Sequence, residues 1–228
     1  MTNPVRTTPR STVRRLRERG SYDRAVVHEV LDEALICHVG FAIDGQPFVI
    51  PTIHARLGDL LYLHGAPANH MLKSLRDGVE ACVTVTLVDG LVLARSAFHH
   101  SVNYRSVCLF GRAAEVTDRE EKRCALDALV DHVLPGRADD ARRANERELQ
   151  GVLVLRLPID EASAKVRTGP PLDDLEDVEL DIWAGVVPLR TMKEPPVRAP
   201  DLRAEVDTPP YLAANFASYV GHGPFRRM

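Results

Sequence analysis

Residues 35–54 read LICHVGFAIDGQPFVIPTIH, and this stretch decides the fold. Two runs rich in β-branched and aromatic residues, 35–43 and 47–54, flank the pair Asp44 and Gly45. An Asp-Gly pair between two such runs favours a two-residue turn with positive φ at both positions, which is the tight turn of an antiparallel hairpin. We therefore predict a β-hairpin over residues 35–54.

Further strand signals follow the hairpin. Apolar or alternating runs predict strands over residues 60–64, 81–88, 91–96, 104–116 and 151–157, with a turn at Asp89 and Gly90 between the second and the third. Because the connections are short, we expect antiparallel pairing in a meandering barrel or sandwich. A parallel sheet needs crossovers of a dozen or more residues.

Helix signals lie between and after these strands. An N-cap at Asp23 predicts a helix that ends near residue 34, and a short helix is expected over residues 69–76. Thr117 and Glu120 have the spacing of a capping box and predict a helix that ends before Pro135. A polar helix is expected over residues 139–149.

Composition bounds the class of protein. A chain of 228 residues with 45% hydrophobic residues can bury a core of its own. The net charge of −3 disfavours dedicated nucleic-acid binding, because there is no surplus of Lys and Arg to bind phosphates. The sequence shows neither a membrane span nor a signal peptide. We expect a cytoplasmic protein that binds neither nucleic acid nor membrane.

Three segments are expected along the chain. Residues 1–20 hold six arginines among Thr, Ser and Pro and are expected to be a flexible basic arm. Residues 21–190 form one domain. Nine of the sixteen prolines follow residue 169, so residues 191–228 are expected to be a proline-rich tail.

Several kinds of site are disfavoured by the absence of their motifs. The nine histidines and four cysteines show no His-Glu-x-x-His, three-histidine or Cys-x-x-Cys spacing, so we expect no metal site. The sequence also lacks the nucleophile elbow of hydrolases, the Rossmann glycine motif and the Walker loop. A nucleotide must therefore be bound in another way.

Residues 64–73 are a candidate phosphate site. A strand ends at His64, small residues follow, and a helix opens with Asn69, His70 and Lys73 in its first turns. Free backbone N–H groups and the helix dipole attract a phosphate there, and His70 or Lys73 adds positive charge. The alternative is a capped surface helix with a solvated lysine.

A second polar cluster lies at the entrance to a strand. Arg105 can pair bidentately with a phosphate, and Asn103 or Ser106 can bond the carbonyl and imide groups of a flat heterocycle. The alternative places Asn103 in a turn and Arg105 in a surface ion pair.

Together these stretches resemble the FMN-binding split barrels related to pyridoxamine 5'-phosphate oxidase, in the branch near the nitroimidazole-resistance proteins. The resemblance covers about residues 20–190 and rests on residues 44–52, 61–66, 84–101, 103–106, 110–112, 161–171 and 183–186. It implies a mainly β fold with flanking helices, a six-stranded antiparallel split β-barrel. It also implies a homodimer with FMN in a groove between the subunits.

The resemblance also implies positions around the flavin. Those along the ring are Ile50, Pro51, Thr52 and Ile53, and those near the ribityl chain and phosphate are His64, Gly65, Asn69 and His70. Met71 stands where the family often has a lysine for the phosphate. Lys73, further along the same helix, would supply the missing positive charge. The positions from which the ring is approached or covered are Arg105, Ser106 and Trp183.

The function implied by the resemblance is that of an FMN-dependent oxidoreductase that passes hydride between the flavin and a small organic molecule. His64 is the candidate proton donor, because an imidazole titrates near neutral pH. Arg167 and Lys165 are candidates for a substrate phosphate, with an ion-paired loop as the alternative. A flavin or haem carrier or sensor without turnover, or a reductase that uses the deazaflavin F420, remain alternatives.

Overall fold

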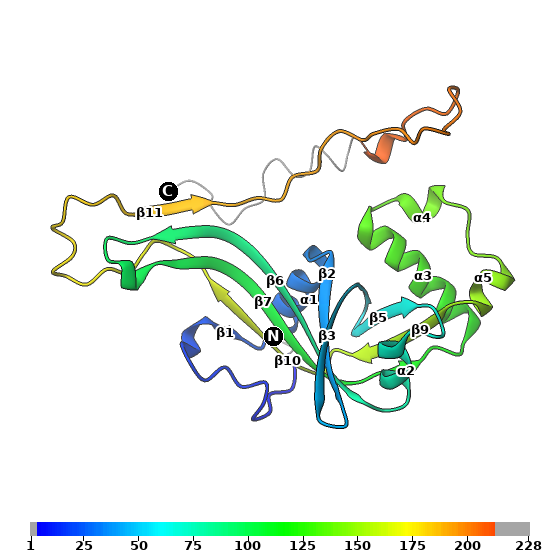
Figure 1. The fold of residues 1–228 in the computed structure, drawn as a ribbon, viewed down its shortest axis with the longest axis horizontal. Coiled ribbons are helices and arrows are strands. Elements are labelled where there is room, and N and C mark those ends of the chain that lie inside the picture. Colours follow the sequence, from blue (N-terminus) through cyan, green and yellow to red (C-terminus); the bar gives the residue numbers. More distant parts are fainter. Residues whose placement is uncertain (1–3, 213–228) are drawn as a thin grey trace.

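The computed structural model describes residues 4–212, which form two antiparallel sheets flanked by helices (Figure 1). The larger sheet has the order β1-β10-β7-β6-β2-β3, with β11 paired to β6, and the smaller has the order β4-β5-β9-β8. The strands are β1 (Gly20–Ser21), β2 (Ile36–Ile43), β3 (Gln46–Ile53), β4 (Ala55–Leu57), β5 (Leu60–Gly65), β6 (Glu80–Leu93), β7 (Ser101–Arg112), β8 (Ala114–Glu115), β9 (Leu153–Pro158), β10 (Glu161–Arg167) and β11 (Gly185–Pro188). The helices are η1 (Arg17–Arg19), α1 (Arg24–Glu33), α2 (His70–Arg76), η2 (Ala97–His99), α3 (Arg119–Val133), α4 (Arg137–Asp140) and α5 (Glu146–Gln150).

The predicted fold class, mainly β and antiparallel with flanking helices, is confirmed. The described residues hold eleven strands rather than six, because short segments of two to four residues pair alongside the longer strands. The strands divide into two sheets and do not close into one barrel.

The hairpin over residues 35–54 is also confirmed. β2 and β3 pair along their whole length, and the turn residues Asp44 and Gly45 have φ of 49° and 77°. Cys37, Val39 and Phe41 alternate along the buried face of β2. Local sequence decides this element, because the turn residues and the alternation agree.

The predicted turn at Asp89 and Gly90 is wrong. β6 runs through both residues, and the register against β7 shifts between Val88 and Gly90, which is a β-bulge. A Cβ at Gly90 would lie 3.0 Å from Val186 Cγ1, so glycine is needed here for the close approach of β11. The chain instead reverses after β6, around η2. Glycine inside a strand marks a bulge as often as a turn.

Two helix predictions need correction. The N-cap of α3 is Asp118 rather than Thr117, and its carboxylate accepts the N–H of Glu121 at 2.7 Å. The carboxylate of Glu121 bonds Tyr62 and Arg156, so it does not complete a capping box. The polar helix expected over residues 139–149 is divided into α4 and α5, because the chain is extended between them.

The basic arm was expected to be flexible, but its described part, residues 4–20, packs against the domain. Val5 is buried in the core, and the Nε of Arg10 bonds the buried carboxylate of Glu161 at 2.7 Å. This contact with Arg10 lowers the pKa of Glu161 to about 2. The pattern of the arm did not reveal this, because the partner carboxylate lies about 150 residues further along the chain.

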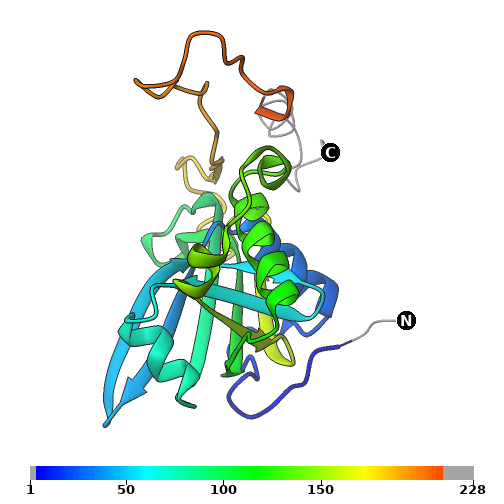
Figure 2. The same cartoon turned by 90° about the vertical axis from the view of Figure 1, so that its right-hand side faces the viewer.

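The main core lies between the sheets, with α1 and α2 packed over it, and α3 packs on the smaller sheet (Figure 2). After β11 the tail runs away from the sheets as extended chain until the Tyr211 hydroxyl bonds Asp140 in α4 at 2.8 Å (Figure 1). Residues 1–3 of the arm and 213–228 of the tail lie outside the described residues. No helix in residues 4–212 combines the length and the apolar character that crossing a bilayer requires.

Candidate functional site

A cavity of about 560 Å³ lies between helices α3, α4 and α5 and the strands β3 and β5. Figure 2 shows these three helices gathered beside the sheets. The wall is mostly apolar and is formed by Ile53, Leu126, Leu129, Val130, Val133, Leu134 and Val152, together with alanines of α4 and of the segment after it. Charged residues also line it, namely Arg123, Asp127, Arg137, Arg142, Arg143 and Glu148.

His64 of β5 contributes to the wall of this cavity. Its Nδ1 is buried and has no hydrogen-bond partner among residues 4–212. Burial lowers the pKa of His64, so the ring is neutral at pH 7 and one nitrogen carries a free lone pair. Other buried side-chain nitrogens of the described residues also lack a partner, among them His54 Nδ1, so His64 is a candidate ligand because its unpartnered ring also lines the cavity.

The arginines at the cavity are held in exposed ion pairs. Arg142 pairs with Glu148 at 2.7 Å, and Arg143 lies 3.6 Å from Asp127. Exposed pairs contribute only about 0–1 kcal/mol, so acidic groups of a ligand can replace these carboxylates at little cost.

The predicted phosphate segment lies between β5 and α2. Gly65 allows a close approach of the two, because a Cβ there would lie 3.0 Å from Leu72 Cδ1. Asn69 is the N-cap of α2 and accepts the N–H of Leu72 at 3.0 Å. Lys73 is exposed and pairs with no carboxylate in residues 4–212, so its charge is available.

His70 is exposed, but one side of its ring contacts the hairpin. Its ring lies against Phe48 and Phe41 of the hairpin, with centroid distances of 5.8 and 6.5 Å. These two phenylalanines stack at 5.3 Å. The contact joins the start of α2 to the end of the hairpin.

Residues 50–53 lie in β3 as predicted. Ile50 and Pro51 are exposed and, as neighbours in a strand, lie on opposite faces of the sheet, whereas Thr52 and Ile53 are half-buried. Ile53 lines the same cavity as His64. β3 therefore connects the exposed face of the larger sheet with the cavity.

Arg105 is ion-paired, which is the alternative to its role as a phosphate ligand. Its guanidinium bonds Asp89 at 2.8 Å and Glu33 at 2.7 Å, and these contacts raise its pKa. The bulge in β6 presents Asp89 for this contact. Arg105 therefore joins α1 to β6 and β7, and its charge is already balanced. Ser106 is half-buried and bonds the Lys165 carbonyl oxygen at 3.3 Å.

Asn103 lies in β7 rather than in a turn, and both the nitrogen and the oxygen of its amide are hydrogen-bonded. Its Nδ2 donates to the Gly169 carbonyl at 3.1 Å, and its Oδ1 accepts from Arg167. Arg167 is buried and also bonds the Pro170 carbonyl, and Lys165 bonds the Arg15 carbonyl at 3.1 Å. These side chains tie the end of β10 to its neighbours.

Trp183 lies just before β11 and is 67% exposed. β11 pairs with the far part of β6, whereas α2 and α3 lie at the opposite end of the molecule (Figure 1). The structure therefore does not bring Trp183 together with His64 and Lys73 of the same chain.

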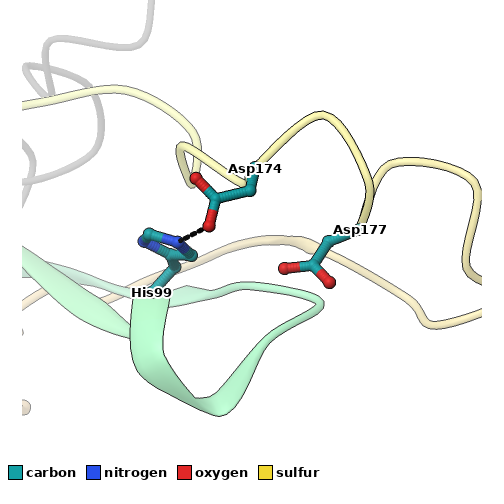
Figure 3. A group of neighbouring side chains, drawn as sticks. All are labelled: His99, Asp174 and Asp177. Atoms are coloured by element: carbon teal, nitrogen blue, oxygen red, sulfur yellow. Dashed lines mark hydrogen bonds and ion pairs between the residues drawn. The ribbon is translucent and has the colours of Figure 1, made fainter.

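A group of side chains that the sequence analysis missed lies near Trp183. His99 of η2 bonds Asp174 at 3.0 Å, and Asp177 lies close to both (Figure 3). The ligand atoms of the three residues lie within 4.8 Å of one another. No spacing in the sequence reveals this group, because His99 and Asp174 are 75 positions apart.

A second missed feature is a pair of histidines between α1 and α3, of which His54 is buried and His132 is half-buried. His54 is fully buried and donates from Nε2 to the Leu31 carbonyl at 2.9 Å, and His132 bonds the Ala34 carbonyl at 2.9 Å. The two rings lie 4.7 Å apart. Burial lowers the pKa of His54 to about 4.

Comparison with known proteins gives the following matches. A family model described as pyridoxamine 5'-phosphate oxidase matches residues 23–166. The flavocytochrome Anf3 from Azotobacter vinelandii is 40% identical, with 91% of this chain and 96% of that chain covered and a TM-score of 0.85. The FAD and heme binding protein from Mycobacterium smegmatis is 39% identical, with 86% and 96% covered and a TM-score of 0.82. A candidate 5-nitroimidazole antibiotic resistance protein from Bacteroides thetaiotaomicron is 27% identical, with 64% and 86% covered and a TM-score of 0.55. No curated protein matches the chain.

Proposed function

The chain belongs to the pyridoxamine 5'-phosphate oxidase family, and on this premise we propose that it is a homodimeric redox protein that binds a flavin and a haem. The observation that carries the proposal is the unpartnered ring nitrogen of His64 at an apolar cavity. The relatives at 40% and 39% identity are named as a flavocytochrome and as an FAD and heme binding protein, which favours both groups over a flavin alone. When bound, a flavin supplies hydride chemistry and a haem supplies one-electron chemistry.

The residues around the cavity fit a haem. A haem is a flat, largely apolar ring with two carboxylates and an iron that accepts a histidine nitrogen. The cavity of about 560 Å³ has the size and the apolar wall of a cofactor site. Arg142 and Arg143 can exchange their present carboxylate partners for those of the haem.

His64 is better suited to bind a metal than to deliver a proton. Burial lowers its pKa, which keeps the ring in the neutral form that ligates iron. Proton donation as an acid requires the imidazolium, which burial disfavours. We therefore assign His64 as the haem ligand in place of the proton donor expected from the sequence.

The flavin is assigned to the face of β3 that carries Phe48 and Ile50, and to the start of α2, because His70 of α2 lies against Phe48. Ile50 offers an exposed apolar side chain for a ring, and Lys73 offers an unpaired charge for a phosphate. Asn69 caps the Leu72 N–H, so the first N–H groups of α2 remain for an anion. The Mycobacterium smegmatis relative is named for FAD, and we propose FAD in place of the FMN expected from the sequence.

The homodimer is supported by an apolar surface on the larger sheet. Large hydrophobic residues are exposed there on neighbouring strands, namely Ile36, Val49, Val88, Leu91, Val102 and Val187. Soluble monomers rarely expose a contiguous apolar surface of this kind.

The first experiment measures the bound groups. Protein purified without added cofactor is expected to show a Soret band and flavin absorption, and chromatography of the released flavin is expected to identify FAD. FMN, or uptake of F420 alone, would revise the flavin assignment. Protein that takes up neither haem nor flavin would refute the proposal.

The second experiment tests His64. The variant His64→Ala is expected to lose the Soret band and to retain its flavin, and added imidazole is expected to restore haem binding. His38→Ala, which changes an exposed histidine of β2, is the matched control. Haem binding by His64→Ala with an unchanged spectrum would contradict the assignment.

Turnover distinguishes a redox enzyme from a carrier. A redox enzyme is expected to show flavin bleaching and haem reduction when NADH or NADPH is added without oxygen, followed by reoxidation by an acceptor. A carrier would show neither change. Screening oxygen, quinones and nitro compounds as acceptors then identifies the substrate class.

A further inference from the structure

Residues 172–183, which we call the acidic loop, lie beside the far end of the β6–β7 hairpin (Figure 1). The loop contains six Asp and Glu and no Lys or Arg. Its start is held in place, because Asp173 pairs with Arg95 at 2.8 Å and Asp174 bonds His99 at 3.0 Å (Figure 3). Four further carboxylates pair with no cation in residues 4–212, namely Glu176, Asp177, Glu179 and Asp181.

The same loop exposes large hydrophobic side chains. Leu175 is 91% exposed, Trp183 is 67% exposed, and Phe98 of the neighbouring η2 is 87% exposed. Leu172, Val178, Leu180 and Ile182 add to this surface. Exposed apolar residues in such number indicate a contact surface, because isolated exposed residues are the rule on monomers.

A surface of opposite charge lies in residues 14–19, which we call the arginine segment. It contains Arg14, Arg15, Arg17 and Arg19 beside one carboxylate, Glu18, and none of the four arginines pairs with a carboxylate in residues 4–212. Leu16 is exposed between them and has a φ of 55°. This left-handed backbone conformation is energetically unfavourable for residues other than glycine. The segment is attached to β10, because Lys165 donates to the Arg15 carbonyl.

We propose that the acidic loop of one copy binds the arginine segment of a second copy. Four unpaired carboxylates match four unpaired arginines, and each surface has exposed apolar residues between its charges. The two surfaces form no ion pair with each other within residues 4–212 of one chain. Because both are present on every chain, a two-fold axis produces two equal contacts and closes the assembly.

This proposal rests on the homodimer of the proposed function and names two surfaces that stabilise that dimer. The contact covers Trp183, which is the only tryptophan of the chain and therefore reports on the loop alone. Its fluorescence is expected to shift to shorter wavelength, and acrylamide quenching to decrease, as the dimer forms with rising protein concentration. High salt is expected to weaken this contact, because its charges are exposed.

Charge reversal tests the partner surfaces in the full chain with its bound cofactors. The first variant carries Arg14→Glu, Arg15→Glu and Arg17→Glu, and the second carries Glu176→Lys, Glu179→Lys and Asp181→Lys. Each alone is expected to raise the dimer dissociation constant about tenfold or more and to expose Trp183. An equimolar mixture of the two is expected to restore both the dimer and the protected Trp183, because each contact then joins opposite charges.

Arg147→Glu on α5 is the control, because Arg147 is exposed and has no ion pair in residues 4–212, and it is expected to change neither measurement. Recovery in the mixture also shows that both variants are folded. Dimers that keep Trp183 as exposed as in the monomer, or a mixture without recovery, would overturn the contact and leave the homodimer itself intact. A chain that stays monomeric by light scattering at all concentrations would overturn both.

Discussion

The buried His54 is expected to make the protein less stable as the pH falls from 7.5 to 5. Its pKa is about 4 in the folded chain, and an unfolded histidine titrates near 6.5. Between these values the unfolded chain binds a proton that the folded chain does not bind. The free energy of unfolding therefore decreases as the pH falls through this range.

The size of the effect follows from the two pKa values. Their difference corresponds to about 3 kcal/mol when the pH lies below both, at ~1.4 kcal/mol for each pKa unit. At pH 5 about 2 kcal/mol of this has been lost relative to pH 7.5. His54 itself is fully buried, so solvent does not screen the effect at its ring, and the half-buried ring of His132 lies 4.7 Å away.

The assay is urea unfolding at pH 7.5 and pH 5.0. His54→Gln keeps an N–H that can donate to the Leu31 carbonyl but does not titrate, so its loss of stability between the two pH values is expected to be about 2 kcal/mol smaller than that of the unaltered chain. His100→Gln changes an exposed histidine and is expected to leave the pH dependence unchanged. An equal pH dependence in His54→Gln and the unaltered chain would refute the reasoning.

Three further outcomes are expected. Glu161→Gln weakens the ionic hydrogen bond from Arg10 and is expected to cost about 1–3 kcal/mol in urea unfolding and to expose the basic arm to trypsin; unchanged proteolysis would show that other contacts hold the arm. Gly90→Val places side-chain atoms against Val186 and is expected to release β11, so hydrogen exchange at residues 185–188 should increase, and unchanged protection would contradict the close packing. Leu126→Trp fills part of the cavity and is expected to lower the haem content measured by the pyridine haemochrome assay without changing the flavin content; an unchanged haem content would place the haem elsewhere.

The two Asp-Gly pairs show where prediction from sequence succeeds and where it fails. Asp44 and Gly45 connect β2 and β3, which pair with each other directly on both sides of the turn, so local preference decides the structure there. Asp89 and Gly90 have the same chemistry but lie where β11 packs against β6, and the tertiary contact converts the expected turn into a bulge. Propensity is a weak guide where a distant segment competes for the same backbone.

The candidate site likewise has one part that the sequence predicted and one part that only the fold creates. The sequence singled out His64 and the segment that leads to Lys73, because a strand, a small-residue loop and a capped helix follow one another there. The cavity beside His64 is formed by α3 to α5, which lie about 60 to 85 residues later in the chain. Arg105 is a candidate phosphate ligand from its sequence context, but in the fold it is ion-paired. Its carboxylate partners Glu33 and Asp89 come from other elements, which the local sequence does not reveal.

The sequence by itself determined the mainly β class, the hairpin, most of the helices and the family, because alternation, turn residues and caps act over a few neighbouring positions. Only the tertiary structure decided that the arm is packed, that His64 has an unpartnered nitrogen at a cavity, and that His99 meets Asp174. Each of these depends on residues far apart in the chain, and their contacts and burial exist only once the sheets and helices have come together.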